Sequence, residues 1–236
     1  MDRSNPDAGI VVALDGPGSS GKSSVGAAAA LELGYRMVDT GLLYRALTWL
    51  ARDRHVPAAE EDRLVALVPE VALAPDDRGR LERVVVDGRD VTDEVHTARV
   101  DEYVSTIAKV PGVRAAFLPV QRALAGDGGI VFAGRDIGTV VLPDADLKIF
   151  LDASVEERAR RRAEERDLEP DGPEARWILA QLRRRDDLDR NRAVAPLRPA
   201  EDAIHILTDG NTFEQTVAAV VAAVRTAEGD RVAASR

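Results

Sequence analysis

Residues 16–23, GPGSSGKS, constrain the fold of this chain most strongly, because they fit the pattern G-x-x-x-x-G-K-[ST]. The apolar run Ile10 to Leu14 precedes them and has the length and β-branched content of a strand. The alanine-rich segment Ser24 to Leu33 follows and has the composition of a helix. The order strand, glycine-rich loop and helix predicts a phosphate-binding loop.

The chemistry of such a loop suits a polyphosphate. Successive backbone N–H groups and the N-terminus of the following helix point at the anion. Lys22 would reach the outer phosphates, and Ser23 would bind a magnesium ion held with them.

The same loop also fits a second pattern, G-x-G-x-x-G, through Gly16, Gly18 and Gly21. Asp39 follows near the distance expected of a ribose-binding acid, so a dinucleotide-binding fold is an alternative. Lys22 and Ser23 favour the phosphate loop, because a dinucleotide site gains nothing from an ammonium group at that position.

Composition limits the remaining classes. A chain of 236 residues with 45% hydrophobic content can bury a full core, as one domain or as a domain with an inserted lobe. A net charge of -9 argues against a general nucleic-acid binder, although a basic cleft on an acidic surface remains possible. Cysteine is absent, and neither a signal peptide nor a membrane-spanning segment is evident, so we expect a cytoplasmic protein.

Hydrophobic periodicity predicts strands that alternate with helices. The expected strands are residues 10–14, 35–38, 130–133, 147–151 and 204–207. The expected helices are residues 24–33, 41–54, 60–68, 95–108, 113–125, 154–166, 173–190 and 212–225. Residues 71–91 read as a small antiparallel insert with a turn at Asp87-Gly88, and the tail from residue 227 as frayed. This order predicts a parallel sheet with helices on both faces.

Two further segments lie where predicted strands end, the edge at which parallel sheets collect ligands. Residues 39–45, DTGLLYR, follow the second strand, and Gly134-Arg135-Asp136 follow the strand at residues 130–133. For the first segment a helix cap at Thr40 and a core position for Tyr44 are an equally simple interpretation. The similar triplet at residues 88–90 lies in the hairpin turn, and we assign it no site role.

Eleven arginines and eleven acidic residues lie between residues 154 and 192. Pairs such as Glu157 and Arg161 at i,i+4 spacing explain part of this pattern as a solvated pair of helices. The crowding in residues 185–192, RDDLDRNR, instead favours arginines arranged around a multiply charged anion, on a hinged lid. The isolated His55, His96 and His205 share no metal-ligand spacing, and no Ser/His/Asp hydrolase is indicated.

Four stretches together resemble the bacterial cytidylate kinases, in the nucleoside monophosphate kinase family. They are DGPGSSGKSS at residues 15–24, VDTGLLYR at 38–45, AGRDIGTVVLPDADLKIFLDAS at 133–154 and RRDDLDRNRAVAPL at 184–197. The resemblance implies an α/β fold: a P-loop three-layer parallel sheet, a monophosphate-binding lobe with a small antiparallel insert, and an arginine-rich lid. It implies one domain at residues 9–226, with the core at 9–39, 129–153 and 173–226, the lobe at about 40–128, the lid at about 154–172, and flexible tails at 1–8 and 227–236.

The resemblance also implies roles for individual residues. The ATP site would comprise Gly16, Pro17, Gly18, Ser19, Ser20, Gly21, Lys22, Ser23 and Ser24, with Mg2+ on Ser23. The CMP site would comprise Thr40, Tyr44, Arg45, Ser105, Arg114, Arg135, Asp136, Arg185, Asp189 and Arg192. The catalytic set would comprise Lys22, Arg135, Arg158, Arg161, Arg162 and Arg192.

Within the CMP site, the family's pattern places Arg45, Arg135 and Arg192 on the monophosphate. It places Thr40, Arg185 and Asp189 at the sugar, and Ser105, Arg114 and Asp136 at the cytosine edge. Thr40 departs from the family's usual serine and keeps the hydroxyl.

The implied activity is ATP-dependent phosphorylation of CMP and dCMP to CDP and dCDP, with Mg2+, in pyrimidine nucleotide metabolism. We expect a cytoplasmic monomer whose partners are ATP and CMP or dCMP, without nucleic acid or membrane. The alternatives are another P-loop nucleotide or small-molecule kinase, a nucleotide-dependent switch, and an NAD-binding oxidoreductase. The switch is disfavoured because the chain has no N-K-x-D guanine-recognition motif.

Overall fold

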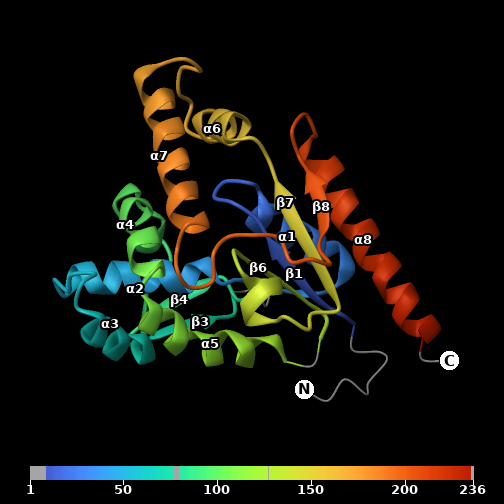
Figure 1. Ribbon diagram of the computed structural model, residues 1–236, viewed down its shortest axis with the longest axis horizontal. Coiled ribbons are helices and arrows are strands. Elements are labelled where there is room, and N and C mark those ends of the chain that lie inside the picture. The colour runs from blue at the N-terminus through green and yellow to red at the C-terminus, as the bar shows by residue number, and fades with distance from the viewer. Residues whose placement is uncertain (1–8, 77–79, 127, 235–236) are drawn as a thin grey trace.

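The computed structural model describes residues 9–76, 80–126 and 128–234, and a five-stranded parallel sheet forms its centre (Figure 1). In spatial order the strands are β2 (Arg36–Asp39), β6 (Ile130–Gly134), β1 (Val11–Asp15), β7 (Leu147–Asp152) and β8 (Ile204–Leu207). All four neighbouring pairs are parallel, with Asp15 beside Gly134 and Asp39 beside Ala133. The chain segments that follow β1, β2 and β6 therefore leave the sheet at one edge.

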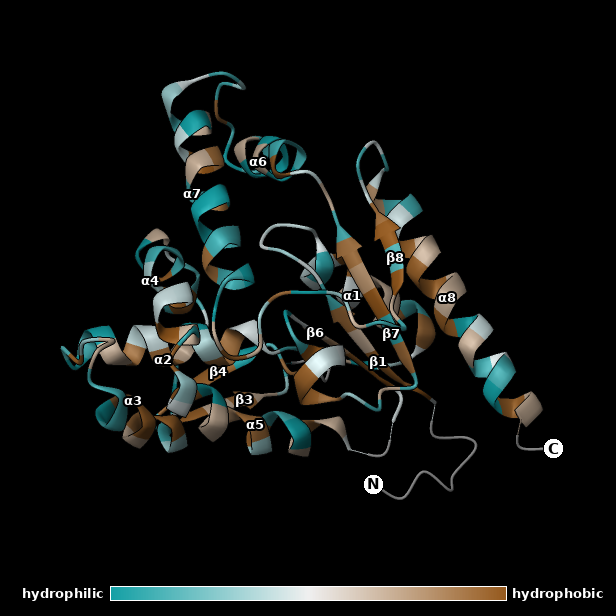
Figure 2. Cartoon of the chain, in the orientation of Figure 1, coloured by the Kyte–Doolittle hydropathy of each residue, from teal (hydrophilic) through white to brown (hydrophobic). Residues whose placement is uncertain are grey.

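Helices cover both faces of this sheet, as predicted. On one face α1 (Lys22–Leu33) and α8 (Phe213–Ala234) pack on Val12 and Leu14. On the other face α5 (Pro111–Ala125) and the π-helical turn η3 (Ile137–Val141) pack on Ala13 and Phe132. The three central strands, β6, β1 and β7, are apolar along most of their length, which suits burial on both faces (Figure 2). The predicted fold class is confirmed.

A lobe inserted between β2 and β6 has a hydrophobic core of its own. Its helices are α2 (Gly41–Asp53), α3 (Glu61–Leu67), α4 (Ala98–Ala108) and α5, with the 3-10 turns η1 (Val68–Glu70) and η2 (Glu94–His96). Its antiparallel sheet consists of β3 (Val71–Ala74), β4 (Arg83–Val86) and β5 (Arg89–Asp90). Asp87 and Gly88 both have positive φ, as the predicted hairpin turn requires.

Two charged helices, α6 (Val155–Glu164) and α7 (Pro173–Arg190), extend beyond the edge of the sheet at which β7 ends (Figure 1). They are joined by a small apolar cluster of Ala159, Ile178 and Leu182. The apolar area between them is small, so ion pairs and hydrogen bonds contribute much of their attachment.

The end of the chain differs from expectation. The sequence predicts a helix that ends at Arg225 and a frayed tail, whereas α8 continues to Ala234. Glu228 accepts a hydrogen bond from the Tyr35 hydroxyl, and Arg231 donates to the Gly9 carbonyl at 2.7 Å, so contacts with the start of the sheet hold the last turns. The predicted flexible segment 1–8 lies outside the described residues, as do 235 and 236. None of the helices in the described ranges is long and apolar enough to cross a membrane.

Phe117 is fully buried in the lobe, where its ring and that of Tyr44 pack edge to face at a centroid distance of 5.1 Å. We expect Phe117→Ala to lower the free energy of unfolding by about 3–5 kcal/mol, because the cavity left behind adds to the lost burial. Urea unfolding would measure this. Val120→Ala, at a position on α5 that is 36% exposed, is the control and should cost less than about 1 kcal/mol. Equal losses would contradict the placement of Phe117 in the core.

Candidate active site

The glycine-rich loop leaves β1 and leads directly into α1 at the edge where the strands end. Gly21 has a φ of 87° just before the helix, a conformation that glycine adopts without strain. At Gly16, a Cβ atom would lie 2.1 Å from the Leu151 carbonyl oxygen, so only glycine fits. The first turn of α1 carries no acidic residue, which leaves the positive end of the helix suited to an anion.

Lys22 is buried beneath this loop. Its Nζ donates a hydrogen bond to the Pro17 carbonyl at 2.9 Å. Burial, and after it the charge of Arg135, holds the pKa of Lys22 well below its usual 10.5. A polyphosphate in the loop would favour the ammonium form again, because an opposite charge nearby stabilises it.

Ser23 and Asp39 bring two oxygen donors together at the loop. The Ser23 hydroxyl donates to the Asp39 carboxylate at 2.5 Å, and the other carboxylate oxygen accepts from the Gly41 backbone at 2.8 Å. Magnesium prefers oxygen ligands and usually takes one or two protein groups together with substrate phosphates. Within the described ranges, no group of three or more His, Asp or Glu side chains could hold a metal by itself. The pair therefore fits an ion that is shared with a bound polyphosphate.

Asp15, at the end of β1, had no role of its own in the sequence analysis. Its two carboxylate oxygens accept hydrogen bonds from the backbone of Ile137 and Gly138, each at 2.8 Å. Burial raises the pKa of this carboxyl from 3.8 to about 6, although the two backbone bonds oppose the rise. Asp15 thus fixes the turn η3, which directly follows Arg135 and Asp136.

A cavity of about 140 Å³ beside the loop brings together all ten residues expected to bind the monophosphate. They come from the start of α2, from α4 and α5, from the end of β6, and from α7 and the segment after it: Thr40, Tyr44, Arg45, Ser105, Arg114, Arg135, Asp136, Arg185, Asp189 and Arg192. Lys22 and Ser23 of the loop line the same cavity. Residues far apart in the sequence thus meet at one place.

The lining of this cavity is strongly basic. Seven basic residues line it, Lys22, Arg45, Arg114, Arg135, Arg162, Arg185 and Arg192, against three acidic residues, Asp39, Asp136 and Asp189. Burial, and then the charge of Arg135, lower the pKa of Arg185 to about 10. Within the described structure the buried Arg185 Nε has no hydrogen-bond partner. Such a donor, among clustered like charges, is suited to an anionic ligand.

Carboxylates hold several of these guanidinium groups in place. Asp136 forms ion pairs with Arg114 and, at 3.2 Å, with Arg192, and all three side chains are at most 6% exposed. Asp189 accepts from Arg135 at 3.1 Å. Burial acts to raise the pKa of Asp189, but the nearby arginines outweigh it and leave the pKa below 3.8. Asp189 is therefore ionised at neutral pH.

A second, larger cavity of about 550 Å³ adjoins the first. It is lined by the loop and the start of α1, by α6, and by the segment that leads from β8 into α8. Of the nine residues expected to bind ATP, six line it: Ser19, Ser20, Gly21, Lys22, Ser23 and Ser24. Sequence reasoning missed several further residues that line it, among them Thr208, Asn211 and Phe213, because no recognisable motif marks them. Ser19, Lys22, Ser23 and Arg162 line both cavities.

The three lid arginines of the expected catalytic set occupy different environments. Arg162 lines both cavities and donates to the Ser19 hydroxyl at 3.1 Å. Arg161 lines the larger cavity and donates to Thr208. Arg158 is only 2% exposed, and its guanidinium is bonded to Asp186 and to the carbonyls of Gly18 and Ala153. The contacts of Arg158 are therefore internal ones.

The fold and the two adjoining cavities define a P-loop protein whose basic cleft is suited to anionic ligands. Residues 12–226 match the family described as Cytidylate kinase, and this chain belongs to that family. The predicted kinase class is confirmed, and the dinucleotide-binding alternative has no support.

Several proteins are similar in sequence to this chain over most of its length. The cytidylate kinase of a Geobacillus species is 44% identical over 210 residues, covering 88% of this chain and 93% of the relative. That of Pelotomaculum thermopropionicum is 44% identical over 215 residues, covering 90% and 95%. A bifunctional pantoate ligase/cytidylate kinase of a Synechocystis species is 44% identical over 216 residues, and the match spans only 42% of that longer protein.

Asp15 should make folding depend on pH. Between pH 3.8 and about 6 the unfolded carboxyl is ionised while the folded one keeps its proton, so this contribution to stability is complete below 3.8 and is lost as the pH rises through 6. The loss amounts to about 3 kcal/mol. Urea unfolding of wild type and Asp15→Asn from pH 4 to 7 should give a stability difference that changes over this window. A difference that stays constant with pH would contradict the raised pKa.

Arg158 and Arg162 should differ in their effect on stability. Arg158→Met leaves the Asp186 carboxylate buried without its partner, and we expect a loss of about 3–5 kcal/mol in thermal or urea unfolding. Arg162→Met removes contacts that are partly shielded from water but leaves Asp101 paired with Arg45, so it should cost less than about 2 kcal/mol. The two variants are matched in chemistry and lie one helical turn apart. Equal stability of the two would refute the structural role of Arg158.

Proposed function

We propose that this protein transfers the γ-phosphoryl group of ATP to CMP and dCMP, giving CDP and dCDP, in pyrimidine nucleotide metabolism. The observation that carries the proposal is that the two cavities share the lining residues Ser19, Lys22, Ser23 and Arg162. Two phosphorylated ligands in these cavities would meet end to end at the loop. Membership of the cytidylate kinase family supports cytidine monophosphates as the acceptors.

ATP would occupy the larger cavity, with its phosphates in the loop formed by Gly16 to Ser24. Phe213, which is 48% exposed and lies at the start of α8, offers a ring face for the adenine base. Thr208 and Asn211 provide polar groups at the same end. Ser23 and Asp39 would hold Mg2+, whose charge would offset that of the outer phosphates.

CMP would occupy the smaller cavity. Arg45, Arg135 and Arg192 would hold its phosphate, and Thr40, Arg185 and Asp189 would face the sugar. At the base, the Asp136 carboxylate can accept a hydrogen bond from the exocyclic amino group of cytosine, and Arg114 can donate to the ring acceptors. Ser105 lines the same cavity and would add a hydroxyl to this edge, beside Tyr44.

The reaction needs no general base. The second pKa of a phosphomonoester is about 6, so its attacking oxygen is already ionised at neutral pH. That oxygen would attack the γ-phosphorus in line, through a loose transition state whose negative charge spreads over the phosphoryl oxygens. Lys22 and Arg162, at the junction of the two cavities, would stabilise this charge and align the two nucleotides.

The lid would exclude water from this junction. We propose that residues 154–172 move as a unit, that Arg162 contacts the transferred phosphoryl group, and that Arg161 acts on the ATP side. Arg158 also belongs to the expected catalytic set, but its bonds to Gly18 and Asp186 support a role in holding the lid to the loop. We propose a monomer that works in the cytoplasm on free nucleotides, without nucleic acid or membrane.

A phosphoryl-acceptor panel tests the proposal. Purified protein with ATP and Mg2+ should release ADP at least about tenfold faster with CMP and dCMP than with UMP, AMP or shikimate, because one hydrogen bond to a charged group discriminates by about 1.5–3 kcal/mol. A coupled ADP assay measures this. Equal kcat/KM for AMP and CMP would refute the cytidine assignment and favour another P-loop kinase.

Asp136→Asn serves as the internal control for base recognition in this panel. The neutral amide oxygen accepts a weaker hydrogen bond from the cytosine amino group than a carboxylate does, and the amide NH2 can donate to the carbonyl that uracil has there. The ratio of kcat/KM for CMP to that for UMP should therefore fall by about tenfold or more. The ratio does not depend on the fraction of folded enzyme, which matters because Asp136 is also part of a buried ion-pair cluster. An unchanged ratio would remove Asp136 from base recognition.

A further inference from the structure

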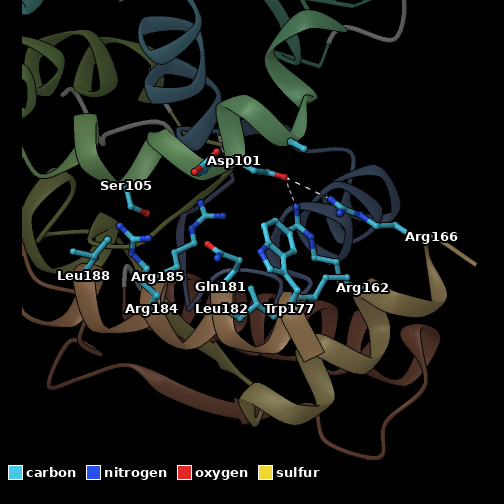
Figure 3. Close-up of a pocket in the computed structure, with 13 residues that line it drawn as sticks. Asp101, Ser105, Arg162, Arg166, Trp177, Gln181, Leu182, Arg184, Arg185 and Leu188 are labelled. Carbon is cyan, nitrogen blue, oxygen red and sulfur yellow. Dashed lines mark hydrogen bonds and ion pairs between the residues drawn. The ribbon is translucent and has the colours of Figure 1, made fainter. Parts of the chain in front are cut away.

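Asp101, on helix α4 of the lobe, contacts arginines of two different parts of the molecule. One carboxylate oxygen pairs with Arg45 of α2 at 2.5 Å. The other pairs with Arg162 of the lid helix α6 and lies 3.8 Å from Arg166, which follows that helix (Figure 3). Asp101 is therefore a direct ionic link between the lobe and the lid.

The link is partly shielded from water. The side chains of Asp101, Arg45 and Arg162 are 18%, 17% and 20% exposed. Burial acts to raise the pKa of Asp101, but Arg45 and Arg162 outweigh it and lower the pKa below 3.8. The carboxylate is thus charged at neutral pH, in surroundings where an ion pair is stronger than at an open surface.

Asp101 contacts both arginines but does not line the 140 Å³ cavity that the monophosphate would occupy. Arg45 and Arg162 line the 140 Å³ cavity, whereas Asp101 lines a neighbouring cavity of about 60 Å³ between α4 and the helices α6 and α7 (Figure 3). Arg162 lines this second cavity as well. Arg45 also donates to the Val95 carbonyl at 3.0 Å, and Arg162 to Ser19 at 3.1 Å. Each guanidinium has five N–H donors. Together with the bond to Asp101, each arginine uses two of its donors within the described structure, which leaves others for a phosphate.

We propose that Asp101 is a positioning residue that holds Arg45 of the lobe and Arg162 of the lid together across the phosphoryl-transfer cavity. This inference rests on the proposed function for its kinetic consequence, but the link between lid and lobe is present without a ligand. The negative charge opposes the repulsion between the two guanidinium groups, so both are in place before the nucleotides arrive.

Loss of the Asp101 carboxylate should affect KM through Arg45 and kcat through Arg162. Loss of the carboxylate frees Arg45, which would hold the phosphate of CMP, and so raises KM for CMP. It also frees Arg162, which would stabilise the transition state, and so lowers kcat. For Asp101→Asn we expect kcat/KM for CMP to fall at least about fivefold, within the range of coupled charged pairs.

Glu102→Gln is the matched control. It makes the same chemical change one residue further along α4, at an exposed side chain for which the described structure shows no ion pair. We expect its kinetics to equal those of the wild type. If Asp101→Asn matches Glu102→Gln, or only lowers thermal stability while KM and kcat stay unchanged, the proposal is overturned.

A double-mutant cycle tests whether Asp101 acts through the arginines. In the Arg45→Met and Arg162→Met backgrounds, adding Asp101→Asn should change KM and kcat, respectively, by less than about twofold, because the partner is already missing. Full additivity in both backgrounds would show that Asp101 acts by another route, and would refute the positioning role.

Trp177 provides a readout without any nucleotide. It lies on α7, is 53% exposed, and lines the same 60 Å³ cavity as Asp101 (Figure 3). In a Trp49→Phe background it is the single tryptophan. Asp101→Asn should shift its emission in the ligand-free protein by more than Glu102→Gln does, because both side chains line the cavity but only Asp101 pairs with the lid. If the wild type does not phosphorylate CMP but the emission shifts, the proposed function is refuted and the link between Asp101 and the lid is supported. If the wild type is active and the emission does not shift, the link is refuted.

Discussion

Repulsion among the basic side chains around the cleft is the force that the rest of the structure must oppose. Seven of them line the 140 Å³ cavity, in a chain whose net charge is -9. Carboxylates from separate elements offset this repulsion through ion pairs: Asp136 pairs with Arg114, Asp189 with Arg135, and Asp101 with Arg45. Each pairing leaves part of the guanidinium for a ligand, so the same contacts that allow the protein to fold also prepare its anion site.

Local sequence patterns were sufficient to predict the order of strands and helices and the parallel sheet. The glycine-rich loop lies between an apolar strand and an alanine-rich helix, and each pattern has a short-range physical cause. The predicted monophosphate site also came together in one cavity, because strands in a parallel sheet end at a common edge and Asp39 and Gly134 lie at strand ends.

Long-range contacts could not be predicted in the same way. Nothing near Glu228 in the sequence indicates that the Tyr35 hydroxyl would hold it, so the length of α8 was underestimated. In the arginine-rich lid, identical side chains four positions apart have different partners: Arg158 contacts Asp186, whereas Arg162 reaches the cleft. Helical spacing alone does not say which of the two faces the loop.

The internal bonds of Arg158 have a mechanical consequence. One guanidinium is bonded both to the carbonyl of Gly18, within the glycine-rich loop, and to Asp186, on the long helix that carries the lid. A change in the shape of the loop would either move the C-terminal part of α7, which carries Asp186, or break one of these buried hydrogen bonds. The glycine-rich loop is thus connected through Arg158 to α7, the helix that carries Arg185 and Asp189 of the 140 Å³ cavity.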